Sequence, residues 1–89
     1  MNVDYTTLAA DVESGALRDR LRAELERGFR EIHESGERLP TASHYASQIA
    51  EILVRNAPSA IDAELAFEIY QEVLEACEKA RDVVIGQVN

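Results

Sequence analysis

The chain has no tryptophan, five Phe and Tyr residues, one cysteine and two prolines among its 89 residues. With so few large aromatic side chains, the core must be built mainly from Ala, Leu, Ile and Val, each of which buries little area. A monomer with such a core has modest stability, and self-association would add to it. The single cysteine, Cys77, excludes an internal disulfide framework.

Basic residues are also scarce. Nine Lys and Arg stand against 17 Asp and Glu, which gives a net charge of −8. Such a field repels nucleic acids and anionic lipid surfaces and attracts basic proteins and peptides. A simpler interpretation is that a net charge of this size keeps a small domain soluble.

Long apolar runs are absent. No run approaches the roughly 20 residues of a membrane span, and the N-terminus lacks the basic flank and apolar core of a signal peptide. We therefore expect a cytoplasmic protein. Hydrophobic residues make up 46% of the chain and Pro and Gly together number six, a composition typical of a packed helical domain. We predict one all-α domain over residues 1–89.

Apolar residues recur at helical spacing in four segments, and Gly or Pro separates them. The first is short, with Asp4 as a possible N-cap, and ends near Ser14. The second is predicted over residues 16–35, with Gly36 at the position where a left-handed residue ends a helix. Its surface outside the apolar stripe carries charges of alternating sign. The apolar face of the first segment is Tyr5, Leu8, Ala9 and Val12, and that of the second is Leu17, Leu21, Leu25, Gly28, Phe29 and Ile32.

The third helix is predicted to begin at Thr41 or Ser43, after Pro40, and to end at Asn56. Pro58 ends this segment, and Ser59 with Asp62 has capping-box spacing for the next helix. The short connection makes the third and fourth helices neighbours, either as an antiparallel pair or around a near-perpendicular turn. The apolar face of the third helix is Tyr45, Ala46, Ile49, Ala50, Ile52 and Leu53.

The fourth helix is predicted from Ala60 to Ile85, roughly 40 Å long. Its apolar residues fill an arc of about 200°, too wide for one neighbour to cover. Either this helix is central in the bundle or part of it faces a second copy of the chain. We predict a small bundle of three main helices plus a short N-terminal one, with the long C-terminal helix central. The arc consists of Leu65, Ala66, Phe67, Ile69, Tyr70, Val73, Leu74, Ala76, Cys77, Ala80, Val84 and Ile85, with Arg81 as the one charge inside it.

The other side of this helix carries a line of acidic residues, which we term the carboxylate stripe: Glu64, Glu68, Glu72, Glu75, Glu78 and Asp82. Like charges four residues apart recur along it, each pair unfavourable by roughly a few tenths of a kcal/mol. The stripe is our candidate docking face for a basic protein. Two simpler interpretations, which we favour together, are a solvated face rich in good helix formers and pairing with arginines of the second helix.

A second candidate contact face runs along the third helix through His44, Gln48, Glu51 and Arg55. A solvated surface is its simpler interpretation. Neither His33 nor His44 has a Glu three residues before it, as a di-metal site in a bundle requires, so we expect no metal or cofactor. Cys77 lies on the apolar arc with no predicted base near it, which is typical of a core residue. We therefore predict no catalytic residues and no enzymatic activity.

The predicted function is non-enzymatic protein–protein interaction, as an inhibitor, immunity-like or regulatory protein. Arg outnumbers Lys eight to one, a usage that favours a bacterial or phage origin. The main alternative is a structural or assembly subunit that self-associates as a homodimer or larger oligomer. A minor alternative is a helix-turn-helix-like nucleic-acid binder over residues 41–72. A recognition helix presents Arg, Lys, Asn or Gln to the groove, whereas the fourth helix presents Glu.

Overall fold

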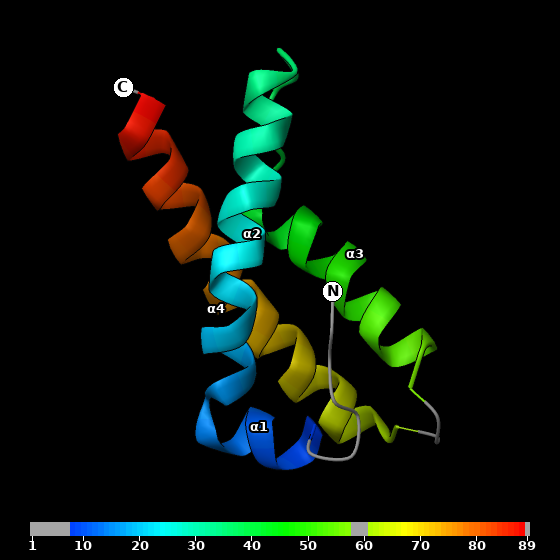
Figure 1. Ribbon diagram of the computed structural model, residues 1–89. Coiled ribbons are helices and arrows are strands. Elements are labelled where there is room, and N and C mark those ends of the chain that lie inside the picture. Colours follow the sequence, from blue (N-terminus) through cyan, green and yellow to red (C-terminus); the bar gives the residue numbers. More distant parts are fainter. Residues whose placement is uncertain (1–7, 58–60, 89) are drawn as a thin grey trace.

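A computed structural model describes residues 8–57 and 61–88 of the chain. This part contains four helices and no strand: α1 (Leu8–Ser14), α2 (Ala16–Glu34), α3 (Ala42–Arg55) and α4 (Ala63–Val88). The predicted all-α bundle of three main helices and a short first one is confirmed (Figure 1). The residues Asp4, Tyr5 and Ser59, which the sequence assigns to helix ends or faces, lie outside the described residues.

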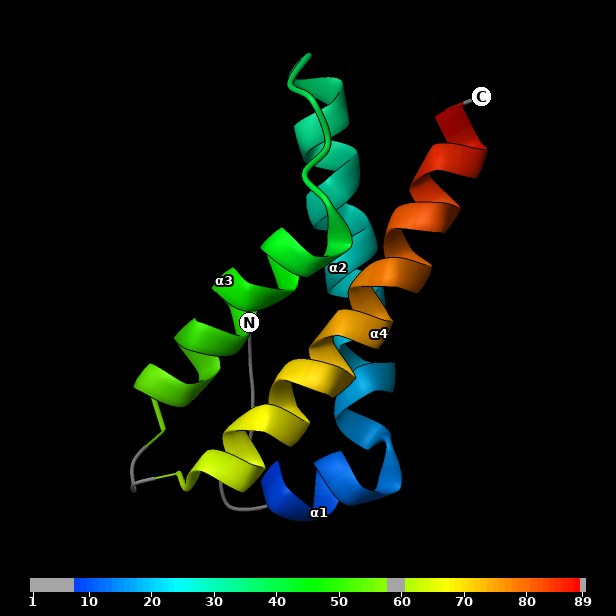
Figure 2. The ribbon, with the colours of Figure 1, turned by 180° about the vertical axis from the view of Figure 1, so that it is seen from behind.

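The three main helices run up, down and up, and α1 crosses the base of the bundle (Figures 1 and 2). Two hydrogen bonds join α2 to α4, from Arg18 Nη1 to Glu75 Oε2 at 2.7 Å and from Arg30 Nη2 to Gln87 Oε1 at 2.9 Å. Both pairs are 57 residues apart in sequence, so α2 and α4 advance in step and in the same direction. Of the two arrangements expected for α3 and α4, the structure has the antiparallel one.

Helix α4 is the central element, because α1, α2 and α3 all pack against it. Its fully buried residues lie on one side and interlock with the apolar faces of α2 and α3. Arg81, the charge inside the arc, is half-buried and donates from Nε to the carbonyl oxygen of Pro40 at 2.9 Å. The buried residues of α4 are Ile69, Val73, Ala76, Cys77, Ala80 and Val84.

Four of the six residues in the predicted stripe of α2 are buried and form the most regular part of the core, while Gly28 and Ile32 are half-buried. Leu17, Leu21, Leu25 and Phe29 are each at most 3% exposed. The ring of Phe29 contacts that of Tyr45 in α3, with centroids 4.6 Å apart, so α2 and α3 also meet directly. The core is therefore continuous across all three main helices.

Three residues predicted to lie on apolar faces are exposed instead: the small Ala9 of α1 and the larger Ile52 and Phe67. Phe67 is 60% exposed and Ile52 is 45% exposed, so their assignment to buried faces is wrong. The two large side chains each lie at the edge of an apolar arc. Ile52 is about 100° around the helix from the buried Leu53, and Phe67 is about 160° from the buried Ile69. Three neighbours cover most of the arc of α4, but not this edge.

Helix ends follow local capping chemistry. Thr41 Oγ1 accepts a hydrogen bond from the backbone N–H of His44 at 3.2 Å and begins α3 as predicted. Gly36 has a φ of 84° and ends α2, again as predicted. Helix α4 begins three residues later than predicted, because Asp62 Oδ1 accepts from the N–H of Leu65 at 2.8 Å and so caps it. It also ends three residues later, at Val88.

Gly28 lies in the middle of α2, where glycine costs about 0.5–1 kcal/mol relative to alanine. A Cβ at this position would lie 2.5 Å from Tyr45 Oη but 3.6 Å from Tyr45 Cζ. The hydroxyl oxygen of Tyr45 therefore leaves no room for a side chain at position 28.

We predict that Gly28→Ala lowers the free energy of unfolding in the wild-type chain and raises it by about 0.5–1 kcal/mol in a Tyr45→Phe background. Without the hydroxyl, the new methyl group makes an ordinary van der Waals contact and only the gain in helix propensity remains. Urea denaturation of the four variants measures this coupling. An equal effect of Gly28→Ala in both backgrounds would contradict it.

Candidate functional site

The carboxylate stripe does not have one uniform environment. Glu64 and Glu68 are exposed at its N-terminal end, and Glu78 and Asp82 are exposed at its C-terminal end. In the middle, the side chain of Glu72 is only 20% exposed and that of Glu75 is 45% exposed. The structure thus divides the stripe into two exposed ends and a middle that α2 partly covers.

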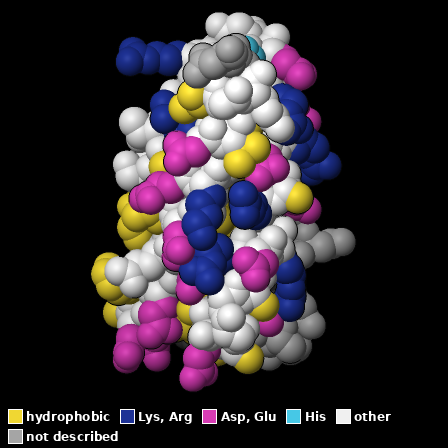
Figure 3. Space-filling view, turned by 90° about the vertical axis from the view of Figure 1, so that its left-hand side faces the viewer, with side chains coloured by type: hydrophobic (Ala, Val, Ile, Leu, Met, Phe, Trp, Pro, Cys, Tyr) yellow, Lys and Arg dark blue, Asp and Glu magenta, His cyan; other side chains and the backbone are white. Residues whose placement is uncertain are grey.

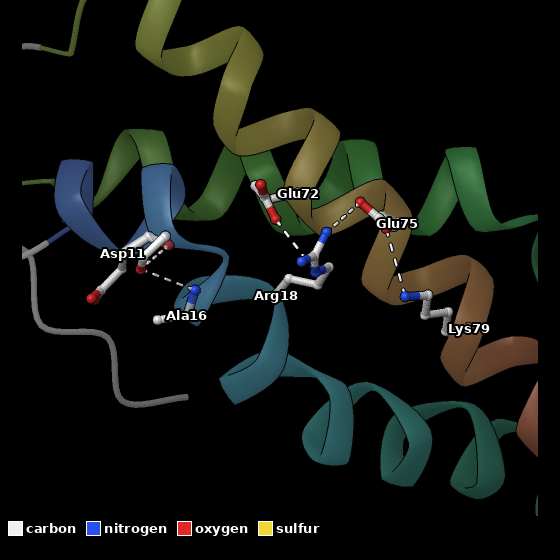
Figure 4. A network of polar contacts seen from close by, with 7 residues as sticks. Asp11, Ala16, Arg18, Glu72, Glu75 and Lys79 are labelled. Carbon is white, nitrogen blue, oxygen red and sulfur yellow. Dashed lines mark hydrogen bonds and ion pairs between the residues drawn. The ribbon is translucent and has the colours of Figure 1, made fainter.

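Arg18 of α2 neutralises the middle of the stripe (Figure 4). Its Nη1 donates to Glu75 Oε2 at 2.7 Å, and its Nε lies 3.8 Å from Glu72 Oε2. Lys79 Nζ lies 3.6 Å from Glu75 Oε1 on the other side. The hydrogen bond from Arg18 holds the pKa of Glu75 below its ordinary value. The interpretation that an arginine of the second helix pairs with the stripe is correct for this middle part.

The other arginines of α2 that form ion pairs are directed elsewhere. Arg20 Nη2 lies 2.9 Å from Asp11 Oδ2 and ties α2 to α1, and Arg22 Nε donates to Glu26 Oε1 at 3.3 Å within α2. On the face shown in Figure 3, basic and acidic side chains are accordingly interspersed. Across residues 8–57 and 61–88, no ion pair involves the exposed ends of the stripe, which are Glu64, Glu68, Glu78 and Asp82.

A cleft of about 440 Å³ opens between α1 and the N-terminal half of α4. Carboxylates of Glu13, Glu68 and Glu72 line it, together with the amide of Gln71 and the apolar side chains of Ala9 and Val12. Glu72 Oε2 is buried and accepts no hydrogen bond from the described residues, since Arg18 Nε is too far away. The wall of the cleft therefore holds more negative charge than the nearby arginine neutralises.

The sequence did not identify Glu13 and Gln71 as site residues. Glu13 is far from the stripe in sequence, and only the crossing of α1 over the base of the bundle brings it to Glu68. Gln71 lies one turn before Glu75 on α4, within the arc left over by the apolar residues. A helical wheel places Gln71 among the residues of the carboxylate stripe. It was not predicted as a site residue because the stripe was defined by its acidic side chains.

The exposed Phe67 borders this acidic cleft. It precedes Gln71 by four residues and follows Glu64 by three, so the three side chains are neighbours on one side of α4. We term the surface made by Glu13, Glu64, Phe67, Glu68 and Gln71 the α1–α4 face. It combines exposed carboxylates, one large exposed ring and a cleft.

The second candidate face, on α3, is exposed along its whole length. Arg55 pairs with Glu51, and Gln48 Nε2 lies 3.4 Å from His44 Nε2, so these four side chains interact in two separate pairs. Because the charges of the face are already paired within it, a partner would gain less there than at the α1–α4 face. A contact role for this surface stays a prediction.

Cys77 lies fully buried in α4, and burial raises the pKa of its thiol to about 12. A thiol of that pKa stays protonated at neutral pH and is a weak nucleophile. In the part of the chain that the structure describes, no group of three or more His, Cys, Asp and Glu residues is placed to hold a metal ion. None of the described helices is both long and apolar enough to cross a membrane.

No protein-family model, curated protein or solved structure matches this chain. The function must therefore be inferred from the chemistry of the surfaces described above.

We predict that Arg18→Gln lowers the thermal midpoint at pH 7 and that this difference from wild type disappears in acid. The pKa of Glu75 is depressed in the folded state, so its pairing with Arg18 stabilises the fold above the ordinary glutamate pKa of about 4.3 and is lost as the pH falls through the lower folded value. Thermal unfolding between pH 7 and pH 2 measures the difference. Arg22→Gln, which removes an ion pair within α2, is the matched control. A difference that persists at pH 2 would show that Arg18 stabilises by packing rather than by charge.

We predict that Cys77 in the folded chain reacts with a disulfide reagent at pH 8 at least about 100-fold more slowly than in urea. Only about one thiol in ten thousand is ionised at that pH when its pKa is about 12, whereas an unfolded cysteine has an ordinary pKa of about 8.5. The release of thionitrobenzoate from Ellman's reagent measures both rates. Equal rates in the presence and absence of urea would mean that Cys77 is accessible in the native state.

Proposed function

We propose that this chain is a non-enzymatic binding protein that holds a basic protein partner against the α1–α4 face. The observation that supports the proposal is which parts of the carboxylate stripe are paired with basic side chains. Arg18 contacts the middle of the carboxylate stripe, while Glu64 and Glu68 form no ion pair with any residue that the structure describes. A cleft with further carboxylates lies beside them.

The energetics of α4 support this proposal. Glu64 and Glu68 are like charges at i,i+4, and Glu68 and Glu72 repeat the pattern, so the free helix carries repulsion that Lys or Arg side chains of a partner would relieve. Charges of opposite sign on the partner would also accelerate its association with a protein of net charge −8. Nucleic acids and anionic membranes gain neither effect, because they are polyanions.

Within this class, we propose an inhibitor, immunity-like or regulatory protein that acts in the cytoplasm of a bacterium or of a phage-infected cell. Each of these roles can be carried out by a binding surface without a catalytic group, and the acidic α1–α4 face and the buried Cys77 support this assignment. The partner is then a protein whose own working surface is basic.

Self-association remains a second candidate function, as a homodimer or larger assembly. The observation that favours it is the exposure of two large apolar side chains, Ile52 and Phe67. Light scattering discriminates between the two functions, since an assembly held by apolar contacts stays intact at high salt, whereas a complex held by the carboxylates is released.

We predict that Glu64→Lys with Glu68→Lys abolishes capture of the partner and leaves the thermal midpoint unchanged or slightly higher. Both side chains are exposed and take part in no described ion pair, so the substitution breaks none. Positions 64 and 68 stay like-charged, whereas the pair at positions 68 and 72 changes from repulsive to attractive. Affinity capture from a lysate of the organism that encodes the chain, with elution by salt and mass spectrometry, identifies the partner. Glu24→Lys, at an exposed position on α2, is the matched control.

Glu72 and Glu75 are unsuitable for this test, because Arg18 contacts both and their reversal would also weaken the packing of α2 on α4. A partner that binds the Glu64→Lys, Glu68→Lys variant as well as wild type would overturn the proposed site.

A further inference from the structure

Phe67 is the most exposed large apolar side chain of the described residues, at 60%. Single exposed apolar residues are common on protein surfaces and need no explanation by themselves. The setting of Phe67 is what distinguishes it. Its helical neighbours Glu64 and Gln71 belong to the α1–α4 face, and Gln71 also lines the cleft between α1 and α4. The ring therefore stands at the border of an acidic surface rather than within an apolar one.

The dimensions of this face suit a helical ligand. Glu64, Phe67, Glu68 and Gln71 span about two helical turns, or roughly 10 Å along α4. Glu13 extends the negative charge across the cleft onto α1, where the exposed Ala9 adds a small apolar surface. An occupant that matches all these groups needs an apolar side chain for the ring and the cleft, and cations on both sides of it.

We propose that the α1–α4 face binds an amphipathic cationic helix of a protein partner. Its apolar side packs on Phe67, and its Lys or Arg side chains pair with Glu64, Glu68 and Glu13. This inference rests on the proposed function, and it adds that recognition is apolar as well as electrostatic. A helix bound to such a face contacts it through side chains three, four and seven residues apart, which is the usual pattern for helical ligands.

A second copy of the chain fits this face poorly. In a two-fold symmetric contact, the same surface meets itself. Contact around Phe67 would therefore place Glu64 and Glu68 of one protomer against the same carboxylates of its partner, in a protein that already carries a net charge of −8. A cationic helix brings compensating charge to those positions instead.

The test uses three synthetic, fluorescently labelled 18-residue peptides. The first carries Leu on one helical side and Lys on the other, the second has the same composition in a scrambled order without an apolar side, and the third has Glu in place of Lys. Fluorescence anisotropy at 0.15 M salt measures the binding of each peptide to wild type, Phe67→Ser, Ile52→Ser, and Glu64→Gln with Glu68→Gln. Ile52→Ser is the matched control, because Ile52 is also an exposed apolar residue but lies on α3.

We expect wild type to bind the amphipathic cationic peptide about ten-fold more tightly than the scrambled one, and Phe67→Ser to remove that difference. Ile52→Ser should leave it unchanged. Glu64→Gln with Glu68→Gln should weaken the binding of both cationic peptides, and the Glu-containing peptide should not bind. Backbone amide shifts in a ¹⁵N-labelled sample should then move at residues 64, 67, 68 and 71 and in α1.

Equal affinity for the two cationic peptides, with no effect of Phe67→Ser, would overturn this inference and leave the proposed function in place. Failure of wild type to bind either cationic peptide would overturn both. Sedimentation that shows a wild-type dimer which Phe67→Ser converts to a monomer would identify a second copy as the occupant and would also overturn the inference.

Discussion

The structure depends on the burial of one wide apolar arc on α4. Six of its residues are completely buried, and α1, α2 and α3 each pack on a different part of the arc. Because most of these residues are Ala, Val or Cys, the neighbouring helices approach α4 closely and the core gains its stability from many small contacts rather than from a few large side chains. Two large rings, those of Phe29 and Tyr45, add a contact where α2 meets α3.

The same constraint determines where charge can be placed. Once the arc is covered, α4 has one free side, and that side holds the carboxylate stripe. Helix α2 carries both signs of charge and uses Arg18, Arg20 and Arg30 to tie itself to the other helices. Only the middle of the stripe receives a cation from it. The division of the stripe into a paired middle and exposed ends is thus a result of how α2 lies along α4.

The main features of the fold could be predicted from the sequence, because periodicity reports which side of a helix is apolar. Leu17, Leu21 and Leu25 recur every four residues, and all three are buried as predicted. Periodicity does not report how far neighbouring helices reach around an arc, so Phe67 was predicted to be buried and is exposed. The start of α4 was misplaced because Ser59 and Asp62 are both good N-caps, and the choice between them depends on packing. The acidic cleft needs Glu13 next to Glu68, and that proximity arises only from the tertiary path of α1.

The two side-chain hydrogen bonds between α2 and α4 each join residues 57 positions apart in sequence, and this distance has a consequence for the order of folding. Each of these hydrogen bonds closes a loop of 57 residues, whereas α3 and α4 are consecutive and antiparallel and can associate as a local hairpin. Contacts of low sequence separation cost less entropy to form, so we expect the α3–α4 hairpin to form first and α2 to dock on it afterwards. Until α2 docks, the apolar side of α4 that it will cover remains open to solvent and to other chains.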